Sequence, residues 1–138
     1  MEKGFTINIH GKSTQIEYSD GNTHIVGLMD WPFGAIKSGK KTIEIRANSD
    51  ERPFDYSVIN DNDILRFINE ESGEFIDTKV IRVTHYTNLR ALFAAEGTEK
   101  SLPVSWSVDQ GIELIHSFPG YKTGIEKYGV YAIEIEVK

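Results

Sequence analysis

The sequence predicts an α+β fold that is mostly β: a mixed barrel of five or six strands with short flanking helices and an added N-terminal hairpin. Most apolar segments alternate apolar and polar residues with the period of two that a strand requires. Only three short segments show helical spacing, and they do not alternate regularly with strands, which argues against a doubly wound parallel sheet. A chain of 138 residues is also long enough to form one domain with a sizeable core.

The N-terminal region predicts a hairpin followed by a strand. Residues 5–18 alternate apolar and polar side chains on both sides of a turn at Gly11–Ser13, which is typical of a β-hairpin. We assign residues 1–23 to this N-terminal extension and residues 24–138 to the main domain. The apolar run from His24 to Met29 predicts the strand with which the main domain begins.

Three short helices carry start and stop signals. They are predicted near residues 32–38, 88–96 and 108–117. Asp30 can cap the first helix, and Gly39 suits the left-handed position that ends it. Ser107 and Gln110 have the spacing of a capping box at the start of the third helix.

The remaining strands supply most of the predicted core. Strands are predicted at residues 41–46, 64–68, 75–86 and 128–137, and a polar loop at 47–62. In the longest strand, Asp77 and Lys79 share parity with Phe75 and Ile81, so we expect a bulge or bend there. The predicted core consists of Ile43, Ile45, Leu65, Phe67, Ile81, Val83, Leu92, Ile112, Ile133 and Ile135.

Composition excludes several classes of protein. A net charge of −6 argues against broad binding to duplex nucleic acid, which needs a basic surface. Cysteine is absent and no histidines pair at metal-ligand spacing, so we expect no disulfide, metal ion or cofactor. No apolar run approaches the roughly 18 residues of a membrane span. We therefore expect a cytoplasmic protein that has no membrane partner.

Basic residues gather in one segment despite the acidic total. Residues 39–46 have the pattern Gly-x-Lys-x-x-Glu-x-Arg, with Lys41, Glu44 and Arg46 at the charged positions. On a regular strand Glu44 and Arg46 project to one face, whereas Lys41 has the opposite parity. These residues alone favour a salt-bridged strand without catalysis. The alternative is a lysine aimed into a barrel mouth, where lost hydration lowers its pKa and suits it to general-base chemistry.

The same motif resembles the signature of the ASCH domain family. Residues Trp31–Lys37 before the motif extend this resemblance, which continues through Asn60–Phe67, Val80–Tyr86 and the closing Glu126–Ile133. It covers about residues 24–138 and resembles in particular the small, stand-alone bacterial ASCH proteins. The resemblance implies a PUA-like β-barrel in which the charged motif residues line a ligand cleft.

The first function implied by the resemblance is binding of RNA or a nucleoside. Lys41 and Arg46 would hold a phosphate group or a base edge, and Glu44 would accept hydrogen bonds from a base amino group. Lys40 would add a ligand contact, and an exposed Trp31 would stack on a base, because single-stranded RNA is recognised by stacking and edge contacts. The ligand's identity and the protein's oligomeric state stay open.

Two other functions compete with binding. Some small ASCH proteins hydrolyse the acetyl amide of N4-acetylcytidine with a lysine, a threonine and a glutamate, and Lys41 matches that lysine. Glu44 stands at the threonine position, so catalysis by Lys41 and Glu44 would require, for example, activation of water by Glu44. The glutamate has no secure equivalent, although Glu96 and Glu99 lie in the corresponding region. The remaining alternative is a non-catalytic protein-interaction module whose partner surface is the N-terminal hairpin.

Overall fold

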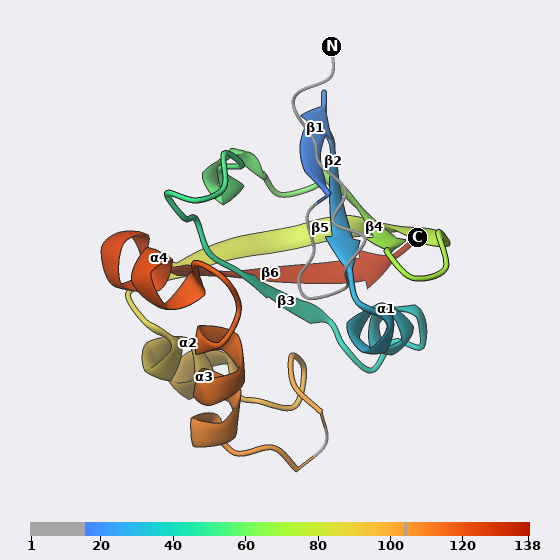
Figure 1. Ribbon diagram of the computed structural model, residues 1–138. Coiled ribbons are helices and arrows are strands. Elements are labelled where there is room, and N and C mark those ends of the chain that lie inside the picture. The colour runs from blue at the N-terminus through green and yellow to red at the C-terminus, as the bar shows by residue number, and fades with distance from the viewer. Residues whose placement is uncertain (1–15, 104) are drawn as a thin grey trace.

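The computed structural model describes residues 16–103 and 105–138, in which a mixed six-stranded sheet is accompanied by four α-helices (Figure 1). The strands are β1 (Glu17–Asp20), β2 (Thr23–Leu28), β3 (Ile43–Arg46), β4 (Ile64–Asn69), β5 (Phe75–Tyr86) and β6 (Val130–Val137). Their order in the sheet is β1-β2-β4-β5-β6-β3. Strands β2 and β4 run parallel, and the other pairs are antiparallel. The predicted α+β fold with a mixed, barrel-like sheet is confirmed.

The four helices are short. They are α1 (Asp30–Lys37), α2 (Leu89–Glu96), α3 (Val108–His116) and α4 (Tyr121–Tyr128), and a 3₁₀ turn spans Tyr56–Val58. The first three lie where the sequence predicted them, and α3 begins with the expected capping box of Ser107 and Gln110. The sequence prediction missed α4. Helices α2, α3 and α4 gather together, while α1 packs apart from them near the end of β2 (Figure 1).

The predicted irregularity in β5 is a register shift between Val80 and Arg82. Val80 pairs with Ile135 of β6 and is fully buried, whereas Ile81 is 38% exposed. The assignment of Ile81 to the core was therefore wrong, because the bulge turns that side chain outward. Seven of the predicted core residues are buried: Ile43, Ile45, Leu65, Phe67, Leu92, Ile133 and Ile135. The other two, Val83 and Ile112, are half-buried and pack at the margins of the core.

Strand β3 lies between two apolar clusters, so all four of its residues are buried. The first cluster joins Ile43 and Ile45 to apolar residues of α2, α3 and α4. The second cluster lies on the other face of the sheet, between α1 and residues such as Tyr56 and Phe67. Because side chains alternate along a strand, Glu44 and Arg46 point away from the helical cluster and toward the second one. The two charged residues are thereby placed in the interior.

The predicted hairpin at residues 5–18 falls almost wholly outside the described residues. The structure does describe β1, which pairs antiparallel with β2 across a turn at Gly21 and Asn22. Within residues 16–103 and 105–138, no helix combines the length and the apolar character that crossing a membrane requires.

Candidate functional site

The motif segment runs from the end of α1 into β3. Gly39 adopts a φ of 84°, in the left-handed region that favours glycine, and it lets the chain leave the helix. The Lys41 amide donates to the Ala35 carbonyl oxygen, and the Thr42 amide donates to the Lys100 carbonyl oxygen. Lys41 is therefore held between α1 and the segment around Lys100, before the regular strand begins.

Lys41 reaches Glu44 because it precedes the strand and does not follow its alternation. The Lys41 Nζ donates to the backbone oxygens of Ile43 at 2.8 Å and Ser101 at 2.9 Å. It also lies 3.4 Å from Oε1 of Glu44, and the Lys41 residue is only 7% exposed. The ammonium group thus has three partners in the interior.

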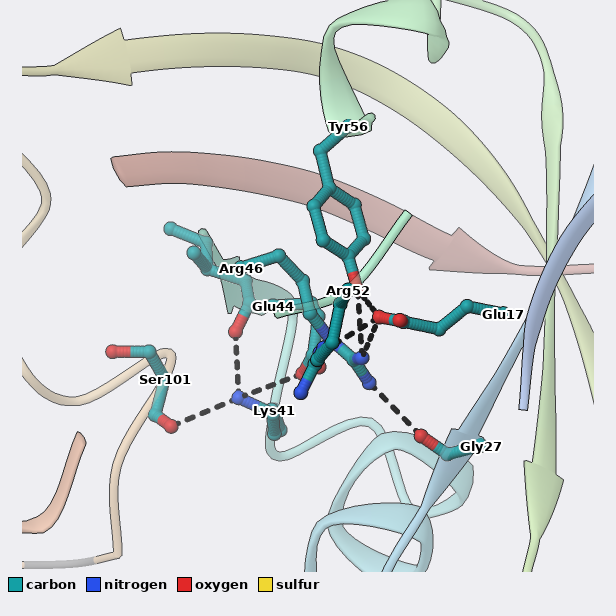
Figure 2. Close-up of polar contacts among 9 residues, drawn as sticks. Glu17, Gly27, Lys41, Glu44, Arg46, Arg52, Tyr56 and Ser101 are labelled. Carbon is teal, nitrogen blue, oxygen red and sulfur yellow. Dashed lines mark hydrogen bonds and ion pairs between the residues drawn. The ribbon is translucent and has the colours of Figure 1, made fainter. Parts of the chain in front are cut away.

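Arg46 connects the motif to the opposite edge region of the sheet. Its Nε donates to Glu44 Oε2 at 2.6 Å, and its Nη2 donates to the Gly27 carbonyl oxygen at 2.9 Å. Its Nη1 donates to the Tyr56 hydroxyl at 3.1 Å and lies 3.5 Å from Oε2 of Glu17. Figure 2 shows these side chains converging from β1, β3 and the loop that carries Tyr56.

Burial and pairing act in opposite directions on these charges. Burial lowers the pKa of Lys41, and the neighbouring Glu44 only partly opposes this effect. Burial alone would raise the pKa of Glu44, but Arg46 and Lys41 outweigh burial and hold that pKa below its ordinary value. Burial disfavours charged Arg46, yet Glu44 and Glu17 raise its pKa. The site therefore holds a carboxylate and a guanidinium that stay charged, beside a lysine that loses its proton more readily than usual.

Three residues cover the Arg46 side of the site. The Arg52 Nη2 donates to Oε2 of Glu17 at 2.8 Å, and the Tyr56 hydroxyl donates to the same oxygen. Glu17 and Tyr56 are both buried, and Arg52 is half-buried. Sequence reasoning missed Glu17, Arg52 and Tyr56, because nothing in their local pattern indicates that they converge on a motif elsewhere in the chain.

The structure brings together three of the five predicted site residues. Lys41, Glu44 and Arg46 form one buried network, with Glu44 and Arg46 only 5% and 3% exposed. Lys40 is exposed, and Trp31 is 51% exposed in the first turn of α1. Within the described residues, neither Lys40 nor Trp31 makes a hydrogen bond or ion pair to the network.

The two glutamates considered for catalysis lie in different environments. The Glu96 carboxylate accepts two hydrogen bonds from Arg82, at 2.7 and 2.8 Å, and one from the Tyr86 hydroxyl at 2.6 Å. Glu99 is exposed. Ser101, whose backbone oxygen contacts Lys41, has a buried hydroxyl that finds no hydrogen-bond partner among the described residues. In Figure 2 that hydroxyl points away from Lys41.

A second polar cluster links the β1–β2 hairpin to the turn before β4. His24 is buried, with Nδ1 2.6 Å from the Ser19 hydroxyl and Nε2 2.7 Å from Asp63 Oδ2. Asp63 also accepts from the Asn60 amide at 2.9 Å. Both ring nitrogens of His24 are therefore satisfied. These contacts hold the hairpin against the body of the sheet.

The mixed, barrel-like sheet and its buried charged motif define a PUA-like domain. The family model for the ASCH domain matches residues 27–138, and the chain belongs to this family. ASCH domains are PUA-like and are associated with RNA binding. The comparison with curated proteins found no match.

Two solved structures are similar to this chain. The crystal structure of hypothetical protein PH0355 has a TM-score of 0.68 and 32% identity, covering 83% of this chain and 96% of that one. The solution structure of protein PF0455 from Pyrococcus furiosus has a TM-score of 0.62 and 31% identity, covering 82% and 94% respectively. Both similarities extend over most of the fold.

Proposed function

We propose that this protein is an RNA- or nucleoside-binding ASCH domain whose ligand cleft is built on Lys41, Glu44 and Arg46. One observation carries the proposal: the three charged motif side chains meet in a single buried network of alternating charge. Burying such charges costs free energy, and apolar residues of similar volume often stabilise a fold as well or better. A buried charged constellation of this kind is typical of a functional site.

Each group has a chemical role in this proposal. Lys41 would donate an N–H to a phosphate oxygen or a base-edge acceptor in exchange for one of its three present partners, and Arg46 would donate from its guanidinium. Glu44 offers a carboxylate to a base amino group, and Arg46 fixes its orientation through the 2.6 Å hydrogen bond. Exposed Lys40 and Trp31 lie outside the buried network and would contact a longer ligand by charge and by stacking.

The remaining charge of the chain limits how the ligand is held. The net charge is −6, so the surface does not attract a polyanion broadly. Binding then depends on a few contacts at the motif, and affinity should change only shallowly with salt concentration, because each neutralised phosphate contributes to that slope.

The binding test compares wild type with Lys41→Ala and with Lys79→Ala, which removes an exposed lysine of β5. Fluorescence anisotropy with labelled single-stranded RNA and competition by nucleosides would measure affinity. We expect Lys41→Ala to weaken binding about tenfold or more, the scale of a charge-assisted hydrogen bond. Lys79→Ala should bind as wild type does. Equal loss in both variants, or no binding by folded wild type, would contradict the proposal.

A second candidate function is hydrolysis of an N4-acetylcytidine-like nucleoside. The observation that favours it is Lys41, whose pKa is lowered by burial, beside the Glu44 carboxylate. In this reaction the basic group, Lys41 or Glu44, takes a proton from a water molecule as the water oxygen bonds to the acetyl carbonyl carbon. The C–N bond then breaks, and the proton passes to the departing amine, giving acetate and the amino nucleoside.

Mass spectrometry would detect this reaction by the loss of the acetyl group. Turnover by wild type that disappears in Lys41→Ala and in Glu44→Gln would establish the hydrolase. Binding without turnover would leave the binding function alone. If the folded protein neither binds nor reacts, the non-catalytic protein-interaction module becomes the better account.

A further inference from the structure

The carboxylate of Glu17 sits in a cradle of three donors. Arg52 donates to it at 2.8 Å, the Tyr56 hydroxyl donates to the same oxygen, and Arg46 Nη1 lies 3.5 Å away. All three donor residues belong to the region matched by the ASCH family, which begins at residue 27. Glu17 comes from β1, before that region. A carboxylate from outside the family domain therefore occupies an anion site built by the domain.

The cradle is held in place by contacts that do not involve Glu17. Glu44 and the Gly27 carbonyl oxygen fix two edges of the Arg46 guanidinium. The Arg52 guanidinium lies 5.3 Å from the centre of the Tyr121 ring, which is cation–π distance. The Tyr56 amide donates to Asn48 Oδ1 at 2.8 Å. Donors fixed in this way need little rearrangement to bind another anion.

Phosphate suits these donors as well as a carboxylate does. Guanidinium groups bind both anions through paired N–H donors, and a phosphate offers more acceptor oxygens. The charged side chains Lys41, Arg46, Arg52, Glu44 and Glu17 sum to a formal charge of +1, which becomes +2 when Glu17 leaves. Departure of Glu17 therefore makes the cradle more attractive to an anion.

A solvent-open cavity and the edge position of β1 would allow Glu17 to leave the cradle and a ligand to enter it. A cavity of about 380 Å³ open to solvent adjoins the cradle, lined by Glu17 itself and by Tyr18 of β1, and by Phe54 and Asp55 of the loop. Among residues 16–103 and 105–138, strand β1 has four residues, lies at the edge of the sheet and pairs with β2 alone. Short edge elements of this kind open at lower free energy than central strands.

We propose that Glu17 is an internal stand-in for a phosphate group of a nucleotide or single-stranded RNA, which binds Arg46, Arg52 and Tyr56 after displacing it. The contact is autoinhibitory, because the same donors cannot hold both anions. This proposal rests on the proposed function for its ligand class. The anion site itself is testable with inorganic phosphate.

The test compares wild type with Glu17→Ala and Glu17→Gln in titrations with inorganic phosphate, a nucleoside monophosphate and a short single-stranded RNA. Glu17→Gln removes the charge while keeping the side-chain volume, so it serves if Glu17→Ala does not fold. Asp20→Ala, which removes an exposed acid from the same strand, is the matched control. Calorimetry gives the affinity, and the phosphate-dependent rise in Tm gives a second measure.

We expect removal of the Glu17 charge to tighten phosphate binding about tenfold or more, and a second substitution, Arg52→Ala, to cancel the gain. Asp20→Ala should leave phosphate affinity unchanged. If the Glu17 variants bind phosphate and the monophosphate more tightly but RNA no better, the anion site is supported and its ligand is a nucleotide. Failure of RNA binding is thereby distinguished from failure of the anion site. The proposal is overturned if folded Glu17 variants bind phosphate no better than wild type, or if Asp20→Ala gives the same gain.

Discussion

Arg46 is the residue on which the charged network depends. Its three guanidinium nitrogens have separate partners: Glu44, the Gly27 carbonyl oxygen, and the pair formed by Tyr56 and Glu17. A lysine has one nitrogen and no planar fork, so it cannot reach these partners together. Removing Arg46 leaves the buried Glu44 carboxylate with Lys41 as its one remaining ion-pair partner among the described residues.

We therefore expect Arg46→Ala to lower the free energy of unfolding by about 3–5 kcal/mol, the usual cost of breaking a buried ion pair from one side. Urea denaturation would measure it. Arg90→Ala is the control, because Arg90 and its partner Asp109 are largely exposed, and it should cost about 1 kcal/mol or less. Similar losses in the two variants would show that the buried network contributes nothing beyond a surface ion pair.

Glu96 gives the molecule an acid-sensitive contact. Hydrogen bonds from Arg82 outweigh burial and lower the pKa of Glu96 from 4.5 to about 2. A carboxyl whose pKa is depressed on folding stabilises the protein above its unfolded pKa, and this contribution is lost as pH falls through the folded value. We expect wild type to lose stability between about pH 4.5 and 2 partly through this group.

Glu96→Gln should remove that part of the acid dependence, measured as unfolding free energy against pH. The effect will be smaller than full burial would give, because Arg82 is 37% exposed and solvent screens the pair. Glu99→Gln, which alters an exposed carboxylate, should follow the wild-type profile. An unchanged slope in Glu96→Gln would contradict the assigned interaction.

Among the elements, β5 and α4 show what sequence patterns can and cannot decide. The conflict in parity along β5 predicted a bulge but not its residue, since both Val80 and Ile81 are apolar. Pairing with β6 determines the position of the bulge, because Val80 lies opposite Ile135 and Arg82 lies opposite Glu134.

Helix α4 was missed because its local signals are weak. It begins after a glycine without a side-chain cap and contains Gly124. A Cβ on Gly124 would lie 2.3 Å from the backbone oxygen of Asn48, so the close approach to that loop requires glycine there. A tertiary contact therefore explains a residue that, taken locally, argues against a helix.

The facing of β5 and β6 can be tested by a pair of substitutions. Ile133 is fully buried, and Ile133→Ala should cost about 2–5 kcal/mol of unfolding free energy. Ile81→Ala should cost about 1 kcal/mol or less, because its side chain already contacts water. Urea unfolding of both variants is sufficient, and a larger loss at Ile81 than at Ile133 would show that the bulge is misplaced.

At the scale of the whole molecule, the network joins the two ends of the sheet. Among the described residues, strands β1 and β3 are its edges. One hydrogen bond from Arg46 of β3 reaches Gly27 of β2, and Glu17 of β1 lies within the same cluster. Side chains, in place of a continuous ladder, therefore hold the barrel-like sheet together there (Figure 2). Ligand binding at these side chains would therefore change the stability with which β1 is held against the sheet.

The sequence predicted the architecture and three members of the buried network for a physical reason. Strand alternation and helix caps are local patterns, so they indicate elements. Alternation alone placed Lys41 on the opposite face from Glu44 and Arg46, and only the family resemblance of the motif grouped the three residues. Glu17 and Tyr56 join the site only through folding. Along the chain, Glu17 lies 27 residues before Glu44, and Tyr56 lies 12 residues after it. Burial of the motif likewise follows from packing on both faces of β3, which no local pattern reveals.

Binding at the buried motif is tested most directly by amide NMR, in which a panel of nucleosides and a short single-stranded RNA are titrated into the protein. We expect the largest shifts within residues 39–46, extending to Gly27 and Ser101, whose backbone oxygens contact the motif side chains. Lys41→Ala should abolish these ligand-induced shifts, while amides remote from the motif keep their wild-type positions. Shifts confined to Trp31 and the surface of α1, with the motif unperturbed, would contradict it.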